Sequence, residues 1–305
     1  MKSMTNKCFK RLMIEPTNIC NLHCPICITG NGLNRTPKGS MKFSHFKAII
    51  DQVKNFVKEI LLWGWGEPFL APDIMKMIDY AGKNDIFIMI HTNGMVLNKK
   101  IMDRFKKNYR LNISFSIDGI TQKNYAYYRK GGNLKRVFKN LSYLVNLKEK
   151  SNLFNLYIIW QFLITKTNEH EIPAAQKFAK NIGVDEFKLK TIRIGKDHHR
   201  YDDFIPANRN LRRKEEKKQT DQDCLFVNPG CPTISWQGDI YPCCQDFWGE
   251  YKMGNAFKDK LLDVWNNKKY IEFRNKLKNG TNYLCNNRCR YKPSSRVYIK
   301  EFNFK

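Results

Sequence analysis

Short apolar or β-branched runs alternate with longer segments of helical period from the start of the chain to about residue 194. This alternation predicts six strands, at 11–16, 59–63, 86–92, 111–117, 156–165 and 186–194. Helices are predicted between and after them at 44–58, 72–83, 98–107, 134–149 and 171–181. Six successive βα units indicate an α/β protein with a parallel sheet, either open and doubly wound or arranged as a barrel.

The pattern changes after residue 197. Residues 198–223 contain a charge run from Arg212 to Lys218 and are predicted to form a linker, or a helix that crosses between domains. Residues 224–292 hold six of the ten cysteines, which predicts a small domain organised by metal because it is too small to rely on apolar burial alone. Residues 293–305 follow as a C-terminal tail.

Composition narrows the class of protein. The 305 residues are 42% hydrophobic and 13% aromatic, which excludes a disordered or collagen-like chain. The most apolar run, 153–164, is too short to span a membrane, and the N-terminus has no apolar core of a secretory signal. We therefore expect a cytoplasmic protein without a membrane partner, whose reduced cysteines are better explained as metal ligands than as disulfides.

The net charge of +26 is compatible with a nucleic acid, an anionic substrate or an acidic protein partner. Lysines are spread along the whole chain, and no basic patch interleaved with aromatic residues stands out. The sequence therefore favours solvated lysines on helix faces and makes nucleic acid an unlikely partner.

The strongest chemical signal is the CxxxCxxC motif of Cys20, Cys24 and Cys27, directly after the first predicted strand. Three thiolates at this spacing can bind three irons of a four-iron cluster, and no fourth cysteine follows nearby to take the last iron. A structural zinc site is the alternative, and it usually pairs two Cys-x-x-Cys or Cys/His hairpins. His23 is a candidate zinc ligand, but its place between two cysteines would strain the loop.

Other candidate site residues follow the ends of successive predicted strands. Residues 64–68 (Gly-Trp-Gly-Glu-Pro) follow the second strand, residues 91–94 (His-Thr-Asn-Gly) follow the third, and Ser114, Ser116 and Asp118 close the fourth. Ligands of parallel α/β folds bind outside the carboxyl ends of the strands. We therefore expect these loops and the cysteine loop to converge on one face.

In these motifs and their order, the chain resembles the radical S-adenosylmethionine (SAM) superfamily over its first six strands. The resemblance implies a partial (βα)6 TIM-like barrel over residues 1–197, in which Cys20, Cys24 and Cys27 hold a [4Fe-4S] cluster. It also implies that SAM chelates the open iron and that its reductive cleavage yields a 5′-deoxyadenosyl radical, which abstracts hydrogen from a substrate.

The same resemblance implies a set of SAM-binding residues. Gly66 and Glu67 match the loop that receives the methionyl amino group, although the first glycine of that family loop is Trp65 here. Ser116 matches a polar residue of the fourth strand that contacts the ribose or carboxylate. The full predicted set is Gly64, Gly66, Glu67, Thr92, Asn93, Ser116 and Arg129.

The C-terminal cysteines carry a second resemblance. Cys231 and Cys243 lie at the ends of a predicted hairpin with a Gln-Gly turn, a helical stretch at 261–277 follows, and Cys285 and Cys289 come last. This order resembles a SPASM/twitch domain and implies one auxiliary [4Fe-4S] cluster held by these four cysteines, with Cys224 and Cys244 as alternates. A structural zinc bound by the same thiolates is the other interpretation.

The predicted function is that of a radical SAM oxidoreductase that oxidises a small or sugar-like molecule, with the auxiliary cluster as electron acceptor. A peptide-modifying (RiPP) maturase is the first alternative, which we rank second because such maturases often carry a leader-binding domain and only 19 residues precede Cys20. A non-catalytic, zinc-stabilised basic binding module is the second alternative, from a different class of protein.

Partners and further residues complete the expectation. An acidic electron carrier, flavodoxin or ferredoxin, suits the strongly positive charge of the chain. Lys188, Lys190 or Arg193 on the sixth predicted strand are candidates to anchor an anionic substrate. Tyr127 and Tyr128 are expected on the loop after the fourth strand, and no catalytic base is identified.

Overall fold

The computed structural model describes residues 8–192, 199–212, 224, 226, 230–246, 248–288 and 298–304. The chain forms two compact units that each combine distant segments. The first unit comprises Met1–Ile19, Asn34–Ile88 and Glu216–Ser294, and the second comprises Cys20–Leu33, Met89–Glu215 and Ser295–Lys305.

The first unit is built on strands in the order β2-β1-β7-β8-β9. Strand β1 (Arg11–Ile14) pairs in parallel with β2 (Glu59–Leu62) on one side and with β7 (Thr233–Ile234) on the other. Strands β8 (Asp239–Tyr241) and β9 (Gly254–Asn255) continue the sheet in antiparallel fashion. The cysteine-rich region therefore extends the sheet that begins with the first predicted strand.

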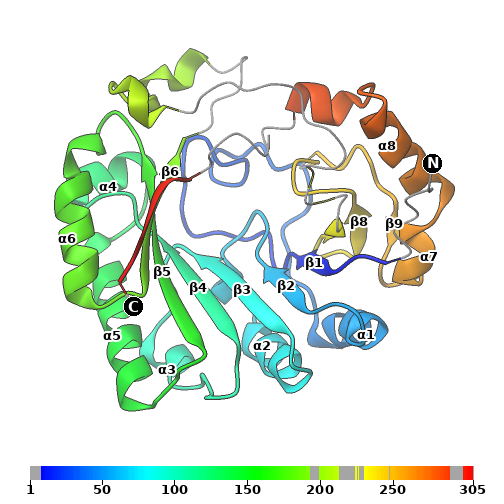
Figure 1. Cartoon of the computed structure of the whole chain (residues 1–305), viewed down its shortest axis with the longest axis horizontal. Helices are drawn as coiled ribbons and strands as arrows, with labels where there is room; N and C mark the ends of the chain where they lie inside the picture. The colour runs from blue at the N-terminus through cyan, green and yellow to red at the C-terminus, as the bar shows by residue number, and fades with distance from the viewer. Residues whose placement is uncertain are drawn as a thin grey trace. The chain divides into compact units, whose positions relative to one another are not determined.

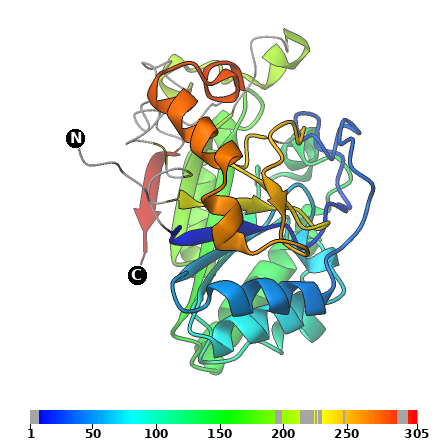
Figure 2. The ribbon, with the colours of Figure 1, turned by 90° about the vertical axis from the view of Figure 1, so that its right-hand side faces the viewer.

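Helices cover the strands of the first unit. In Figure 2, α1 (Phe43–Val53) and α2 (Ile74–Lys83) run side by side, and α1 buries apolar residues at helical spacing. The 3₁₀ turn η1 (Pro68–Leu70) precedes α2. The stretch predicted at 261–277 is two helices, α7 (Leu261–Trp265) and α8 (Lys268–Lys278), because Asn267 between them caps α8 by accepting a hydrogen bond from the Tyr270 N–H.

The strands of the second unit follow the order β10-β6-β5-β4-β3. Strand β3 (Phe87–Thr92) begins in the first unit and ends in the second. Strands β4 (Leu111–Ser116), β5 (Leu156–Ile164) and β6 (Glu186–Thr191) are parallel, and β10 (Tyr298–Asn303) lies antiparallel beside β6 (Figure 1).

Helices α5 (Leu134–Lys150) and α6 (Ile172–Ile182) lie on the same side of β5 and β6 (Figure 1). Helix α6 ends at Gly183, whose φ of +90° is the left-handed C-cap that favours glycine. The remaining helical elements of this unit are α3 (Lys99–Met102), α4 (Gln122–Tyr128), η2 (Glu169–Glu171), η3 (His199–Phe204) and η4 (Arg209–Leu211).

The predicted α/β class with a mostly parallel sheet is confirmed, and all six predicted strands form with slightly shorter ends. The helix predicted at 98–107 is shorter, because only the four residues of α3 are helical. Helix α4 and strand β10 were not predicted, and β10 lies in the segment expected to be a tail. Among the described helices, none is long and apolar enough to cross a membrane.

Candidate active site

The three cysteines of the CxxxCxxC motif lie on one loop of the second unit. The thiols of Cys20 and Cys27 both act on the pKa of Cys24, so the three are electrostatic neighbours. Burial raises the pKa of the Cys24 thiol to about 12, and the positive charge of Arg129 opposes that rise. A Cβ on Gly30 would lie 2.5 Å from the Cys24 nitrogen, so this glycine lets the loop fold back on itself.

Residues from the ends of β3 and α4 reach this loop. Asn93, which follows β3, donates through Nδ2 to the Asn21 Oδ1 at 2.9 Å and to the Cys20 Sγ at 3.9 Å. Arg129, at the C-terminus of α4, donates through Nη1 to the Cys24 Sγ at 4.0 Å. The structure thus brings these two predicted site residues onto the cysteine loop of the second unit.

Thr92 and Asn93 also fix their own turn. The Thr92 Oγ1 accepts a hydrogen bond from the Gly94 N–H at 3.0 Å, and the Asn93 Oδ1 accepts one from the Met95 N–H at 2.9 Å. Both side chains are buried. Thr92 therefore has a structural role in this turn, and its predicted contact with SAM stays a prediction.

A buried ion pair holds Arg129. Its Nε lies 2.5 Å from the Asp118 Oδ2, and the two side chains are 15% and 0% exposed. Burial alone would lower the pKa of Arg129, but the charges of Asp118 and Cys24 raise it well above its usual range. In the sequence, Asp118 and the glycine after it indicate only a turn. No sequence pattern predicts that Asp118 pairs with Arg129, eleven residues later.

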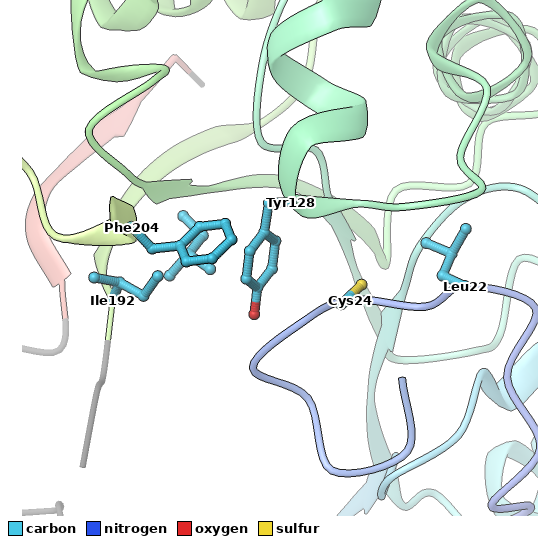
Figure 3. Close-up of a cluster of buried hydrophobic side chains, with 6 residues drawn as sticks. Leu22, Cys24, Tyr128, Ile192 and Phe204 are labelled. Carbon is cyan, nitrogen blue, oxygen red and sulfur yellow. The ribbon is translucent and has the colours of Figure 1, made fainter. Parts of the chain in front are cut away.

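A small apolar cluster borders the cysteine loop. Figure 3 shows the Tyr128 ring between Phe204 and Cys24, with Ile192 on the Phe204 side and Leu22 on the cysteine loop. The rings of Tyr128 and Phe204 meet edge to face, with centroids 5.8 Å apart. Tyr127 and Tyr128 belong to α4 and not to a loop, so the expectation for both residues was wrong. The cluster excludes water from one side of Cys24.

The Gly-Trp-Gly-Glu-Pro loop lies in the first unit, against the segment that follows β1. The Glu67 N–H donates to the Ile19 carbonyl at 2.8 Å, and Ile19 directly precedes Cys20 in the chain. A Cβ on Gly66 would lie 2.3 Å from the Thr17 carbonyl oxygen. The buried Glu67 carboxylate accepts from the Phe69 N–H at 3.3 Å and so caps η1. The Glu67 carboxylate is therefore engaged within its own loop.

Glu15 was missed by the sequence analysis and holds this loop in place. Its carboxylate is 5% exposed and accepts hydrogen bonds from the Trp65 N–H at 2.9 Å and the Trp236 N–H at 3.4 Å. Burial raises the pKa of Glu15, and these two N–H groups oppose the rise. A Cβ on Gly64 would lie 2.5 Å from the Glu15 Cγ. The close approach of the Glu15 side chain therefore requires glycine at position 64.

A row of polar side chains crosses the strands of the second unit. The strand register pairs Ser116 with Gln161 and Gln161 with Lys188, which places all three on one face. Ser116 and Gln161 are buried, and the Lys190 Nζ donates to the Gln161 Oε1 at 3.3 Å. Lys188 forms an ion pair of 3.0 Å with Glu186. The candidate anchor Arg193 lies outside the described residues.

His91 shares the electrostatic environment of this row. Burial lowers the pKa of His91 to about 3, and the charges of Lys190, Lys188 and Arg129 lower it further. The imidazole is therefore neutral at pH 7, where it can accept a hydrogen bond without adding to the positive charge.

The low pKa of His91 predicts a pH-dependent stability. In the unfolded chain this histidine takes up a proton near pH 6.5, whereas in the folded protein it does so only near pH 3. The free energy of unfolding is therefore expected to fall by about 1 kcal/mol between pH 7.5 and 5.5 through this residue alone. Urea unfolding of wild type and His91→Asn at both pH values measures the difference, and an identical pH dependence would contradict it.

The described C-terminal cysteines belong to the first unit, where Cys224, Cys231 and Cys244 are electrostatic neighbours. Strands β7 and β8 form the hairpin predicted between Cys231 and Cys243, with Gly238 at a φ of +85° in its turn. Burial raises the pKa of Cys231, and Cys244 and Cys224 raise it further, so both alternates lie near it. Cys285 is partly buried at the π-helical turn Leu284–Arg288, and Cys289 lies outside the described residues.

The cysteine loop fits the ligand set of a four-iron cluster. The thiols of Cys20 and Cys27 lie near enough to Cys24 to raise its pKa, and each cysteine of a four-iron cube binds a different iron. Within the described ranges, no group of three His, Cys, Asp or Glu side chains is arranged to hold a single metal ion.

The auxiliary ligands can be identified by single substitutions. Cys231→Ala and Cys243→Ala are each expected to lower iron from about 8 to about 4 per chain, because a cube that loses one of four thiolates is poorly retained. Iron analysis after anaerobic reconstitution measures this loss, with Cys224→Ala and Cys244→Ala as the test of the alternates. Full iron in Cys231→Ala would remove Cys231 from the ligand set.

The fold and these two cysteine sites define the class of protein. The Radical SAM superfamily model matches residues 14–161, and the SPASM model of an iron-sulfur cluster-binding domain matches residues 224–290. The chain belongs to the radical SAM superfamily and carries a SPASM domain behind its core. Its cofactors are accordingly SAM, a [4Fe-4S] cluster and an auxiliary cluster.

Individual relatives are distant. The chain is similar to the tungsten-containing aldehyde ferredoxin oxidoreductase cofactor-modifying protein of Pyrococcus furiosus, with 24% identity over 87% of this chain and 83% of that protein. Other matches cover a smaller part of both proteins. The chain spans 50% of the AdoMet-dependent heme synthase of Methanosarcina barkeri, with 28% identity over 60% of this chain.

Solved structures show the same fold. Streptococcus suis SuiB bound to S-adenosylmethionine matches with a TM-score of 0.68 and 20% identity, over 87% of this chain and 67% of that one. BtrN in complex with AdoMet and 2-DOIA matches with a TM-score of 0.58 and 17% identity, over 97% of this chain and 99% of that one. These likenesses confirm the predicted fold class, and the substrate is a separate question.

Proposed function

We propose that this radical SAM enzyme is an oxidoreductase that acts on a small, polar or sugar-like molecule. The observation that carries the proposal is the row of Ser116, Gln161 and Lys188, in register across β4, β5 and β6. The hydroxyl of Ser116 and the amide of Gln161 are buried and Lys188 is partly buried, and such groups are costly to desolvate unless they are hydrogen-bonded. A ligand rich in hydroxyl or anionic groups offers these side chains further hydrogen bonds, whereas an apolar ligand does not.

The proposed chemistry is a two-electron oxidation. When bound at the reduced cluster, SAM supplies a 5′-deoxyadenosyl radical that takes a hydrogen atom from the substrate. Loss of that hydrogen atom, one electron and one proton converts an alcohol into a carbonyl. Cys231, Cys243, Cys285 and Cys289 would hold the auxiliary cluster, which supplies a one-electron acceptor. The side chains of Ser116, Gln161 and Lys188 orient the hydroxyl group of the substrate by hydrogen bonds. The neutral imidazole of His91 takes part as an acceptor.

The test is substrate-dependent SAM cleavage. Reconstituted protein with excess dithionite is incubated with SAM and a panel of polyols, amino sugars, sugar phosphates and peptides, and 5′-deoxyadenosine is quantified. We expect one class to stimulate its release, with deuterium transferred from labelled substrate carbon. Lys188→Met should weaken that stimulation about tenfold, and the matched change Lys135→Met on the exposed side of α5 should not. Stimulation by peptides alone would contradict the proposal.

A peptide-modifying maturase is the second candidate, favoured by two relatives. A structure of Streptococcus suis SuiB is bound to the precursor peptide SuiA, and it matches this chain with a TM-score of 0.66. The mycofactocin maturase MftC of Mycobacterium ulcerans is 30% identical over 107 residues, and the chain spans 28% of it. The non-catalytic zinc module has no such support, because both matched families are named for radical SAM or iron–sulfur chemistry.

An acidic flavodoxin or ferredoxin is the proposed electron donor, because the chain carries a net charge of +26. Charge-steered association weakens with salt, so the rate of cluster reduction by flavodoxin should fall several-fold between 50 and 300 mM NaCl. Stopped-flow absorbance at the cluster band measures the rate. A rate independent of salt would exclude charge steering.

A further inference from the structure

Two side-chain N–H groups reach two of the three thiols that hold the SAM-binding cluster. The Asn93 Nδ2 lies 3.9 Å from the Cys20 Sγ, and the Arg129 Nη1 lies 4.0 Å from the Cys24 Sγ. These are long hydrogen bonds to a large, soft acceptor. Hydrogen bonds to the sulfurs of a cluster are among the factors that set its reduction potential.

The amide of Asn93 has one defined orientation. Its Oδ1 accepts from the Met95 N–H at 2.9 Å, which only the amide oxygen can do. Its Nδ2 donates to the Asn21 Oδ1 at 2.9 Å, on the cysteine loop itself. The NH₂ group is therefore fixed on the side of Cys20.

The guanidinium of Arg129 is fixed as well. Asp118 accepts from its Nε at 2.5 Å, and the other carboxylate oxygen of Asp118 accepts from the Leu163 N–H in β5 at 2.8 Å. The guanidinium also lies 5.3 Å from the centre of the Tyr128 ring. Because the guanidinium is planar and rigid, anchoring its Nε directs Nη1 toward Cys24.

We propose that Asn93 and Arg129 raise the reduction potential of the cluster by donating N–H groups to the Cys20 and Cys24 sulfurs. One-electron reduction adds one negative charge to the cluster and its thiolates. A fixed N–H dipole and a buried positive charge stabilise that added charge more than they stabilise the oxidised form. The proposal rests on the cluster that the proposed function requires, but it holds without SAM or substrate.

The test is a redox titration of the reconstituted full chain in the absence of SAM, followed by electron paramagnetic resonance. The signal that disappears when Cys20, Cys24 and Cys27 are all replaced by alanine belongs to this cluster. At a fixed solution potential we expect the ratio of reduced to oxidised cluster to fall about tenfold in Arg129→Gln, which is 59 mV for a one-electron couple. We expect about a threefold fall in Asn93→Ala.

Matched controls remove the same chemical groups elsewhere. Arg136→Gln and Asn146→Ala change exposed residues of α5 and should leave the ratio unchanged. Arg129→Lys keeps the charge but loses the planar donor group, so its ratio should fall about threefold, and this variant carries the test if Arg129→Gln does not assemble the cluster.

The possible results separate this inference from the proposed function. Wild-type potentials in Asn93→Ala and in the Arg129 variants, with full iron content, would overturn the inference and leave the enzyme intact. An unchanged signal in the triple cysteine variant would overturn the cluster assignment, and with it both proposals. A lowered ratio in both single variants and not in the controls supports the inference.

Discussion

Replacement of Cys20, Cys24 and Cys27 by alanine is expected to abolish release of 5′-deoxyadenosine from SAM. The same variant should lose about 4 of about 8 irons per chain, because we propose that these thiolates hold one of two four-iron clusters. Without that cluster no iron is open to SAM and no electron reaches its sulfonium group. Iron and sulfide analysis and chromatographic detection of 5′-deoxyadenosine under dithionite measure both effects.

Cys8→Ala is the matched control, since Cys8 is a partly buried cysteine of the first unit outside both predicted ligand sets. It should keep all its iron and its SAM cleavage. Zinc in place of iron in wild type would support the binding module and reject the radical mechanism. Zinc only at the C-terminal site would keep the radical chemistry but remove the auxiliary electron acceptor.

The alternating strands and helices were predictable, because the period of their hydrophobic residues is enough to define them. Strand β5 is nine residues long and apolar except for Gln161, and α5 is a seventeen-residue amphipathic helix. Both lie close to their predicted bounds. Helix α4 was not predicted, because seven residues make only about two turns and show no clear helical period of hydrophobicity. Only the capping residue Thr121 marks its start. Strand β10 was not predicted, because it pairs with β6, which lies more than 100 residues earlier in the chain. No local sequence pattern indicates such a pairing.

Some residues of the candidate site were likewise predictable from the sequence, and others were not. The cysteine loop carries its chemistry in its own spacing, so its three thiols were predictable without a fold. Glu15 and Asp118 act through partners that are distant in the sequence: Glu15 through the backbone of residues 65 and 236, and Asp118 through Arg129 and Leu163. A single acidic residue at a strand end has many structural roles, so the function of these two is visible only once the chain is folded.

Gly66→Ala is expected to weaken SAM binding by about tenfold. An added Cβ would lie 2.3 Å from the Thr17 carbonyl oxygen and 2.7 Å from the Ile19 carbonyl oxygen, and both are backbone atoms that cannot rotate away. The Gly-Trp-Gly-Glu-Pro loop must therefore move, and overpacking of this kind typically costs about 1–3 kcal/mol. Because each 1.4 kcal/mol is a factor of ten in affinity, the dissociation constant of SAM reports the displacement.

Equilibrium dialysis of SAM against the reconstituted protein measures that constant, and iron content shows whether the clusters remain. Gly280→Ala makes the same chemical change where no atom lies within 4 Å of the new Cβ. Its φ of +69° adds backbone strain without a clash, so it controls for lost glycine flexibility. Weak SAM binding in Gly66→Ala with full iron would assign the loop to SAM, as the family resemblance implies. The added Cβ forces the loop to move away from the Thr17 and Ile19 carbonyl oxygens. An unchanged dissociation constant of SAM would therefore mean that this loop does not contact SAM.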